Sequence, residues 1–115
     1  MSEIKKITDK LLSFRKDRDW EQFHNPKDMA LSLTLEAAEV LEHFQWKNGE
    51  ILREYVKNNK EYLGEELADV FGWILLMSHD LNIDIIDAME KKIIKNSIKY
   101  PVEKSRGRAD KYNKL

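Results

Sequence analysis

Two pairs of carboxylate residues are the side chains in this sequence most able to carry chemistry. Glu36 and Glu39 form the first pair, and Glu66 and Asp69 form the second. On a helix, residues three positions apart project from the same side, about one turn from each other. A single pair of this kind is more often a solvated helix face, but both pairs interrupt apolar stretches of the sequence. Two such pairs therefore favour a common site.

Four carboxylates that meet in a partly dry interior repel one another. They either take up protons, with raised pKa values, or collect divalent cations. Oxygen ligands in a chain without cysteine favour Mg²⁺ or Mn²⁺ over zinc. Mg²⁺ commonly keeps some waters and shares its remaining positions with substrate phosphates, so the pattern indicates a phosphorylated substrate.

The elements that must position these carboxylates are predicted to be helices. Apolar residues at spacings of three and four predict a first helix over residues 3–16. Asn25 and Pro26 predict the start of a second helix that runs to Phe44. That helix is apolar nearly all round, as expected of a helix buried on several sides. Residues 50–59 then form either a short polar helix or a structured connection.

A third long helix is predicted over residues 60–81, and it carries the clearest core stripe in the sequence. The stripe comprises Leu63, Leu67, Val70, Ile74, Met77 and Leu81. Asp84 can cap a fourth helix, which ends at Pro101. Residues 102–115 are mostly charged and are expected to form a flexible tail after a single domain of residues 1–101.

The fold class that follows is all-α. The 42% hydrophobic and 36% charged residues, with only 4 Gly and 2 Pro, leave too few turn formers for a many-stranded β fold. We expect four main helices packed as a bundle around one core. In a chain of 115 residues that core is small, so dimerisation is expected to complete it.

Charge and composition exclude several classes of partner and site. With 20 Lys and Arg against 21 Asp and Glu, the chain has no global basic field for a nucleic-acid polymer. The absence of cysteine excludes disulfides and thiolate metal sites and suits a cytoplasmic location. The longest strongly apolar stretch, residues 70–77, is too short to span a membrane. Neither His43 nor His79 forms the Glu-x-x-His pair of a di-iron bundle, so both are interpreted as structural.

The carboxylate pattern, two pairs separated by 26 residues, resembles the signature of the MazG-like superfamily of all-α nucleoside triphosphate pyrophosphohydrolases. The flanking residues are similar to its dCTP pyrophosphatase branch. The matching blocks are Arg18-Asp19-Trp20-x-x-Phe23-His24-x-Pro26, Phe44-Gln45-Trp46, Glu65-Glu66-Leu67-Ala68-Asp69-Val70 and Lys92-x-x-x-Asn96-x-x-Lys99-Tyr100-Pro101. These blocks occur in order and with family-like spacing, whereas residues 107–112 match more weakly.

The resemblance implies that the chain converts a nucleoside triphosphate to the monophosphate and pyrophosphate. The implied substrate is dCTP or a modified or noncanonical deoxynucleoside triphosphate, removed in house-cleaning of the nucleotide pool. By the same resemblance, Glu36, Glu39, Glu66 and Asp69 bind Mg²⁺, with Mn²⁺ as an alternative. The metal would neutralise the triphosphate and lower the pKa of an attacking water. Glu39, with Glu36 beside it, is the candidate general base for that water.

The resemblance also assigns residues to the substrate and implies a homodimer or homotetramer. Four residues would surround the base and three would contact the sugar, base or phosphates: Trp20, Phe23, His24, Trp46, Lys92, Asn96 and Tyr100. Stacking on aromatic rings is a general way to hold a base. Without the resemblance, the aromatic residues fit a core or interface equally well, and the lysines fit a solvated helix face. Arg106, Arg108 and Lys111 could close over the triphosphate.

Two other functions stay open at this point. The same fold could hydrolyse another phosphorylated metabolite, although the aromatic residues around Trp20 favour a ligand with a base. Alternatively, the chain could be a noncatalytic helical dimer that binds a nucleotide. All four metal positions hold carboxylates, which argues against that alternative.

Overall fold

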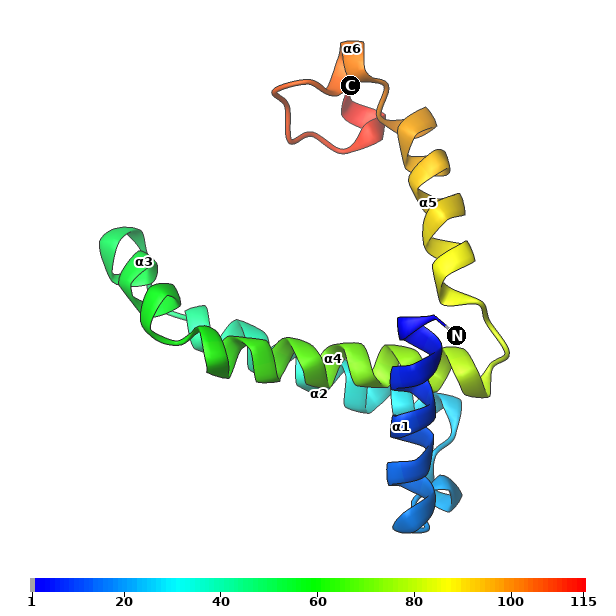
Figure 1. Ribbon diagram of the computed structural model, residues 1–115. Coiled ribbons are helices and arrows are strands. Elements are labelled where there is room, and N and C mark those ends of the chain that lie inside the picture. The colour runs from blue at the N-terminus through cyan, green and yellow to red at the C-terminus, as the bar shows by residue number, and fades with distance from the viewer. Residues whose placement is uncertain (1) are drawn as a thin grey trace. The chain divides into compact units, whose positions relative to one another are not determined.

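The computed structural model describes residues 2–115, and within that range it contains helices and no strand (Figure 1). The predicted all-α class is therefore confirmed. The chain divides into two compact units, Met1–Asn82 and Ile83–Leu115. Among the described helices, none is both long enough and apolar enough to cross a membrane.

Helix α1 (Glu3–Asp17) begins at the predicted residue, and Ser2 caps it. The Ser2 side chain accepts a hydrogen bond from the backbone N–H of Lys5 at 3.1 Å, which satisfies one of the N–H groups left free at a helix start. The helix packs against α4 (Lys60–Asp80), where Leu11 lies over Gly72. This contact places the end of α1 beside the C-terminal half of α4.

Helices α2 (Pro26–Phe44) and α4 form the scaffold of the first unit and lie side by side (Figure 1). Helix α2 begins at Pro26 because the Asn25 side chain accepts a hydrogen bond from the backbone N–H of Asp28 at 2.9 Å. A proline in the first turn needs no partner for an N–H group, so it fits this position. The two helices that carry the carboxylate pairs are thus direct neighbours.

Helix α3 (Gly49–Asn58) lies where the sequence predicted either a short polar helix or a structured connection. Gly49 has a φ angle of 52°, in the left-handed region that glycine adopts without strain, and this turns the chain sharply after α2. Helix α3 packs on α4. It therefore lies close to the carboxylate pair at the start of α4.

The buried apolar core of the first unit is small. It consists of Met29 on α2 with Leu75 and Leu76 on α4, near the crossing of α1. Leu67, in the middle of the predicted core stripe, is 58% exposed, so the other helices of the first unit leave that side of α4 uncovered. Within the first unit, the prediction that α2 is buried on several sides is also wrong. Its more-than-half-exposed residues are Leu31, Leu35 and Leu41.

The second unit is built on one long helix. It contains α5 (Ile85–Lys99), the short helix α6 (Val102–Ser105) and a 3₁₀ turn (Tyr112–Lys114). Asp84 caps α5, as predicted, by accepting a hydrogen bond from the Asp87 N–H at 3.1 Å. The ring of Tyr112 lies edge-on to Tyr100 with the ring centroids 6.2 Å apart. The division of the chain into a domain of residues 1–101 and a flexible tail stays a prediction.

Candidate metal and nucleotide site

The pairing of α2 with α4 brings the four predicted carboxylates together. Glu36 and Glu39 project from α2, and Glu66 and Asp69 project from α4. One oxygen from each residue lies within 4.8 Å of the others. Glu36 and Glu66 are half-buried, whereas Glu39 and Asp69 are exposed. We refer to these four residues as the carboxylate cluster.

The electrostatics of the carboxylate cluster are unfavourable without a cation. Burial, followed by the neighbouring carboxylates of Glu39, Asp69 and Glu66, raises the pKa of Glu36. One buried oxygen of Glu36 and one of Glu66 have no hydrogen-bond partner. Unpartnered, buried carboxylate oxygens are costly unless a cation binds them. Four converging carboxylates with free oxygens fit a hard divalent cation such as Mg²⁺ or Mn²⁺.

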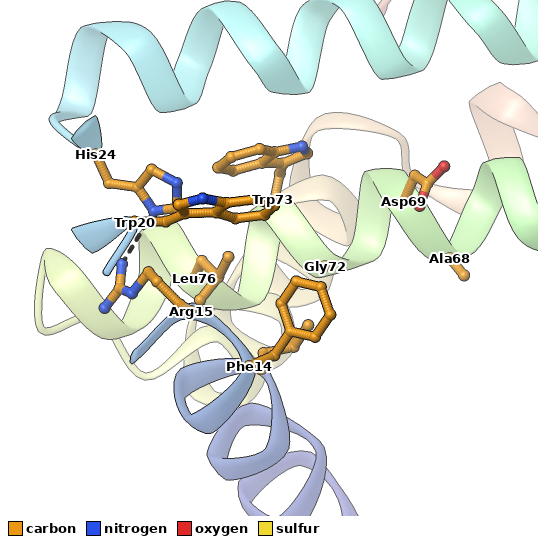
Figure 2. A pocket seen from close by; sticks show the side chains of 10 residues that line it. Phe14, Arg15, Trp20, His24, Ala68, Asp69, Gly72, Trp73 and Leu76 are labelled. Atoms are coloured by element: carbon orange, nitrogen blue, oxygen red, sulfur yellow. Dashed lines mark hydrogen bonds between the residues drawn. The ribbon is translucent and has the colours of Figure 1, made fainter. Parts of the chain in front are cut away.

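An apolar pocket of about 220 Å³ adjoins the carboxylate cluster. Figure 2 shows the rings of Trp20, His24 and Trp73 in this pocket, with Asp69 further along α4. Its other lining residues come from α1 and α4: Leu11, Phe14, Arg15, Ala68, Gly72 and Leu76. Because Asp69 belongs to both features, a ligand in the pocket would extend directly to the carboxylates.

The turn after α1 positions Trp20. Asp19 adopts a φ angle of 54°, and the backbone N–H of Trp20 donates to the Arg15 carbonyl at 3.1 Å. The Trp20 ring then meets Phe14 edge-on, with centroids 5.8 Å apart. The Arg18 guanidinium stacks over the Phe14 ring, 3.6 Å from its centroid. The end of α1 thus supplies one wall of the pocket.

A part-buried ion pair adjoins the pocket through Arg15, which is one of the lining residues. Arg15 is 4% exposed, and its two terminal nitrogens donate to the two carboxylate oxygens of Asp80 at 2.7 and 2.9 Å. These hydrogen bonds lower the pKa of Asp80. The pair joins the end of α1 to the end of α4 with the bidentate geometry that arginine favours.

His24 is held in one tautomer by the same arginine. Arg15 Nη1 lies 3.3 Å from His24 Nδ1. Since a guanidinium can only donate, Nδ1 must accept and the proton of the neutral imidazole lies on Nε2. Burial, and then the charge of Arg15, lower the pKa of His24, which favours that neutral form. His24 therefore offers an N–H donor from Nε2 beside Trp73.

A sequence profile of the MazG-like family matches residues 31–115, which include the whole carboxylate cluster. The chain belongs to the MazG-like family. The match also covers α3 and the second unit, and it leaves out the whole of α1, the Trp20 turn and the first residues of α2.

Individual relatives resemble this MazG-like chain over nearly all its length. It is 36% identical to dCTP pyrophosphatase 1 of Mus musculus and 35% identical to that of Homo sapiens, in each case over 104 residues. These alignments cover 89% of this chain but only 61% of the relatives, so the chain spans about three fifths of their length. The crystal structure of a pyrophosphatase from Archaeoglobus fulgidus superimposes with a TM-score of 0.83 at 35% identity, covering 88% of this chain and 94% of that one.

The structure does not bring every predicted substrate residue to the pocket. Phe23 and Trp46 are 63% and 90% exposed, and neither lines the pocket. Lys92, Asn96 and Tyr100 belong to the second unit, where the first two lie exposed on α5 and Tyr100 contacts Tyr112. In the first unit, the predicted base contacts that meet in one place are Trp20 and His24.

Sequence reasoning missed other residues of this site. Trp73, Arg15 and Asp80 were not singled out, because the ion pair joins residues far apart in the sequence. His43, interpreted as structural, contacts the cluster: its Nε2 lies 3.3 Å from Oε1 of Glu66. One signal could have found it, since His43 follows Glu39 by four positions on the same helix face.

Proposed function

We propose that this MazG-like protein is a metal-dependent nucleoside triphosphate pyrophosphohydrolase. It cleaves between the α and β phosphates and releases a nucleoside monophosphate and pyrophosphate. The observation that carries this proposal is the carboxylate cluster, with its unpartnered buried oxygens, adjoining an aromatic pocket at Asp69. The carboxylate cluster would hold a metal with the phosphates, and the aromatic pocket would hold a base. The names of the relatives agree with this assignment.

The four carboxylates would hold Mg²⁺, with Mn²⁺ as a substitute. A metal bound there would neutralise the triphosphate charge and lower the pKa of an attacking water. Glu39 is the candidate general base, because it is the exposed carboxylate of the α2 pair and can reach such a water. Glu36 lies one turn away and serves as a more buried ligand.

The pocket suits a single base. Its volume of about 220 Å³ is below the roughly 300–1,000 Å³ typical of pockets that enclose a drug-sized ligand, so it would hold part of a nucleotide. Trp20 and Trp73 provide apolar faces for stacking. The N–H of His24 suits an acceptor such as the O2 or N3 atom of cytosine. We therefore place dCTP, or a modified cytosine or other noncanonical deoxynucleotide, first among the substrates.

We place the remaining predicted residues in an oligomer. Within the first unit the apolar faces of α2 and α4 are exposed, and within the second unit the face of α5 is exposed. The α5 face comprises Ile86, Met89, Ile93, Ile94 and Ile98. Covering these faces with a second copy would complete the four-helix bundle. In that homodimer or homotetramer, Phe23 and Trp46 would cover the base, and Lys92, Asn96 and Tyr100 would contact phosphates and sugar. We propose that this assembly acts on the cytoplasmic nucleotide pool.

A product analysis tests the proposal. The purified protein is incubated with canonical and modified nucleoside triphosphates in Mg²⁺ or in EDTA, and the products are separated by ion-exchange chromatography. Monophosphate and pyrophosphate, formed only with metal, are expected, with dCTP or a modified dNTP turned over fastest. Diphosphate and orthophosphate would refute the cleavage position. No turnover of any nucleotide would favour another phosphorylated substrate or a noncatalytic binding protein.

A further inference from the structure

A chain of two hydrogen bonds connects three helices to the carboxylate cluster. Tyr55 on α3 hydrogen-bonds His43 Nδ1 through its hydroxyl, and His43 on α2 hydrogen-bonds Glu66 on α4 through Nε2 at 3.3 Å. The side chains of His43 and Glu66 are only 16% and 24% exposed. Among the predicted metal ligands, Glu66 alone lies within 4.0 Å of a Lys, Arg or His nitrogen in the part of the chain that the structure describes.

The direction of these hydrogen bonds follows from the groups involved. An ionised carboxylate can only accept, so His43 Nε2 must carry a proton and donate to Glu66. In the neutral imidazole, Nδ1 then accepts the proton of the Tyr55 hydroxyl. If the imidazole is charged, Nδ1 donates to the hydroxyl oxygen instead, and the contact with Glu66 is unchanged. The orientation of Glu66 therefore does not depend on the charge of His43.

The two oxygens of Glu66 have different environments. Oε1 is engaged by His43, while Oε2 is buried and has no partner. A carboxylate held by one oxygen presents the other in a fixed direction, and such outer contacts orient metal ligands in proteins. We propose that His43 and Tyr55 are positioning residues that hold Glu66 so that Oε2 faces the metal. This inference rests on the proposed function.

Two residues that flank α3 contact Tyr55, one at its backbone and one at its ring. The Asn59 side-chain amide donates to the Tyr55 carbonyl at 2.8 Å, at the end of α3. The ammonium of Lys47 lies 4.3 Å from the centroid of the Tyr55 ring, a distance at which a cation is attracted to an aromatic face. Helix α3 contributes no predicted metal ligand or base contact, so the positioning of Tyr55 gives it a role at the site.

Mn²⁺ binding without nucleotide tests the role of His43. The free ion is measured by electron paramagnetic resonance during titration of the protein. Removing the donor with His43→Leu should weaken binding by about 10- to 100-fold, the usual effect of losing an outer partner of a metal ligand. His43→Gln, whose amide can still donate to Glu66, should recover most of the affinity. The matched control is His79→Leu, at an exposed histidine near the end of α4.

Tyr55→Phe provides the second variant, since it removes only the hydroxyl group. It should weaken Mn²⁺ binding in the same direction as His43→Leu but by less, because Glu66 keeps its direct donor. If His43→Leu fails to fold, Tyr55→Phe still decides the question, and His43→Gln serves as the conservative control. Binding equal to wild type in folded His43→Leu, or in Tyr55→Phe, would overturn the positioning role and leave the proposed function intact. A wild-type protein that binds no Mn²⁺ would overturn both.

Discussion

Two groups of charged side chains lie along helix α4, and they differ in whether their charges are paired within the chain. At its C-terminal end, Arg15 meets Asp80 with two short hydrogen bonds, which lower the pKa of Asp80. In its first half, the carboxylate cluster has no lysine or arginine partner among the described residues, and burial raises the pKa of Glu36. The charges of the first group are paired within the chain, whereas the proposed metal would neutralise those of the second.

Within the first unit, the Arg15–Asp80 pair supports the structure, and the carboxylate cluster is the proposed site of chemistry. The Arg15–Asp80 pair joins two helices and fixes His24, so it shapes the aromatic pocket. The carboxylate cluster instead leaves two buried oxygens without a hydrogen-bond partner, which lowers the stability of the fold unless a cation binds. Substitutions at the pair should therefore affect stability first, and substitutions at the cluster should affect metal binding and turnover first.

The largest expected effect is on catalysis. Glu39→Gln should reduce the rate of pyrophosphate release by at least about 100-fold, since it removes a metal ligand and the candidate base. The fold should persist, because the change relieves repulsion among the carboxylates. Product release and far-ultraviolet circular dichroism measure the two properties. Glu65→Gln, on the same helix as Glu66 but outside the cluster, should retain the wild-type rate. Turnover that survives Glu39→Gln would contradict the site assignment.

The next effect is on stability. Asp80→Asn should lower the free energy of unfolding by about 3 kcal/mol, because it leaves the buried Arg15 charge without its partner. This value is at the lower end for a buried pair, since the Asp80 side chain is 26% exposed. Urea unfolding measures it. Asp9→Asn, which breaks the exposed pair with Lys5, should change stability by less than about 1 kcal/mol. Equal losses of stability in Asp80→Asn and Asp9→Asn would refute the contrast between the Arg15–Asp80 pair and an exposed ion pair.

Metal addition should stabilise the protein through the cluster alone. With Mg²⁺ or Mn²⁺ at about 100 times its dissociation constant, the free energy of unfolding should rise by about 2.7 kcal/mol, seen as a higher Tm. Glu36→Gln should largely abolish this rise. Asp80→Asn should keep the rise, although its starting Tm is lower. A metal effect that Glu36→Gln leaves untouched would place the ion elsewhere.

The smallest effect is the pH dependence of stability without metal. Asp80, with a lowered pKa, contributes stability that is present above its ordinary pKa and is lost as the pH falls through the lowered value. Glu36, with a raised pKa, has the opposite effect: its destabilisation is absent in acid and grows as the pH rises from the ordinary to the raised value.

Unfolding in EDTA between about pH 3 and pH 8, which brackets the ordinary carboxyl pKa values, separates these contributions. Asp80→Asn should reduce the loss of stability as the pH falls, and Glu36→Gln should reduce the loss of stability as the pH rises. Identical pH profiles for the two variants would show that the two groups do not differ as described.

Much of the fold was predictable because it depends on local interactions. Asn25 and Asp84 cap helices where their side chains indicated, because a cap is decided by neighbours in the sequence. The spacing of Glu36 and Glu39 likewise fixes their common helix face. The exposure of Leu67 was not predictable, since it depends on whether another helix covers that part of α4.

The sequence by itself determined the helical class, the two carboxylate pairs and the family resemblance, because helix periodicity and short spacings are local properties. Only the tertiary structure decided that Arg15 pairs with Asp80, that Trp73 joins Trp20 and His24, and that His43 contacts Glu66. These contacts depend on how α1, α2 and α4 pack together. That packing follows from side chains distant in the sequence, so no local pattern encodes which of them will meet.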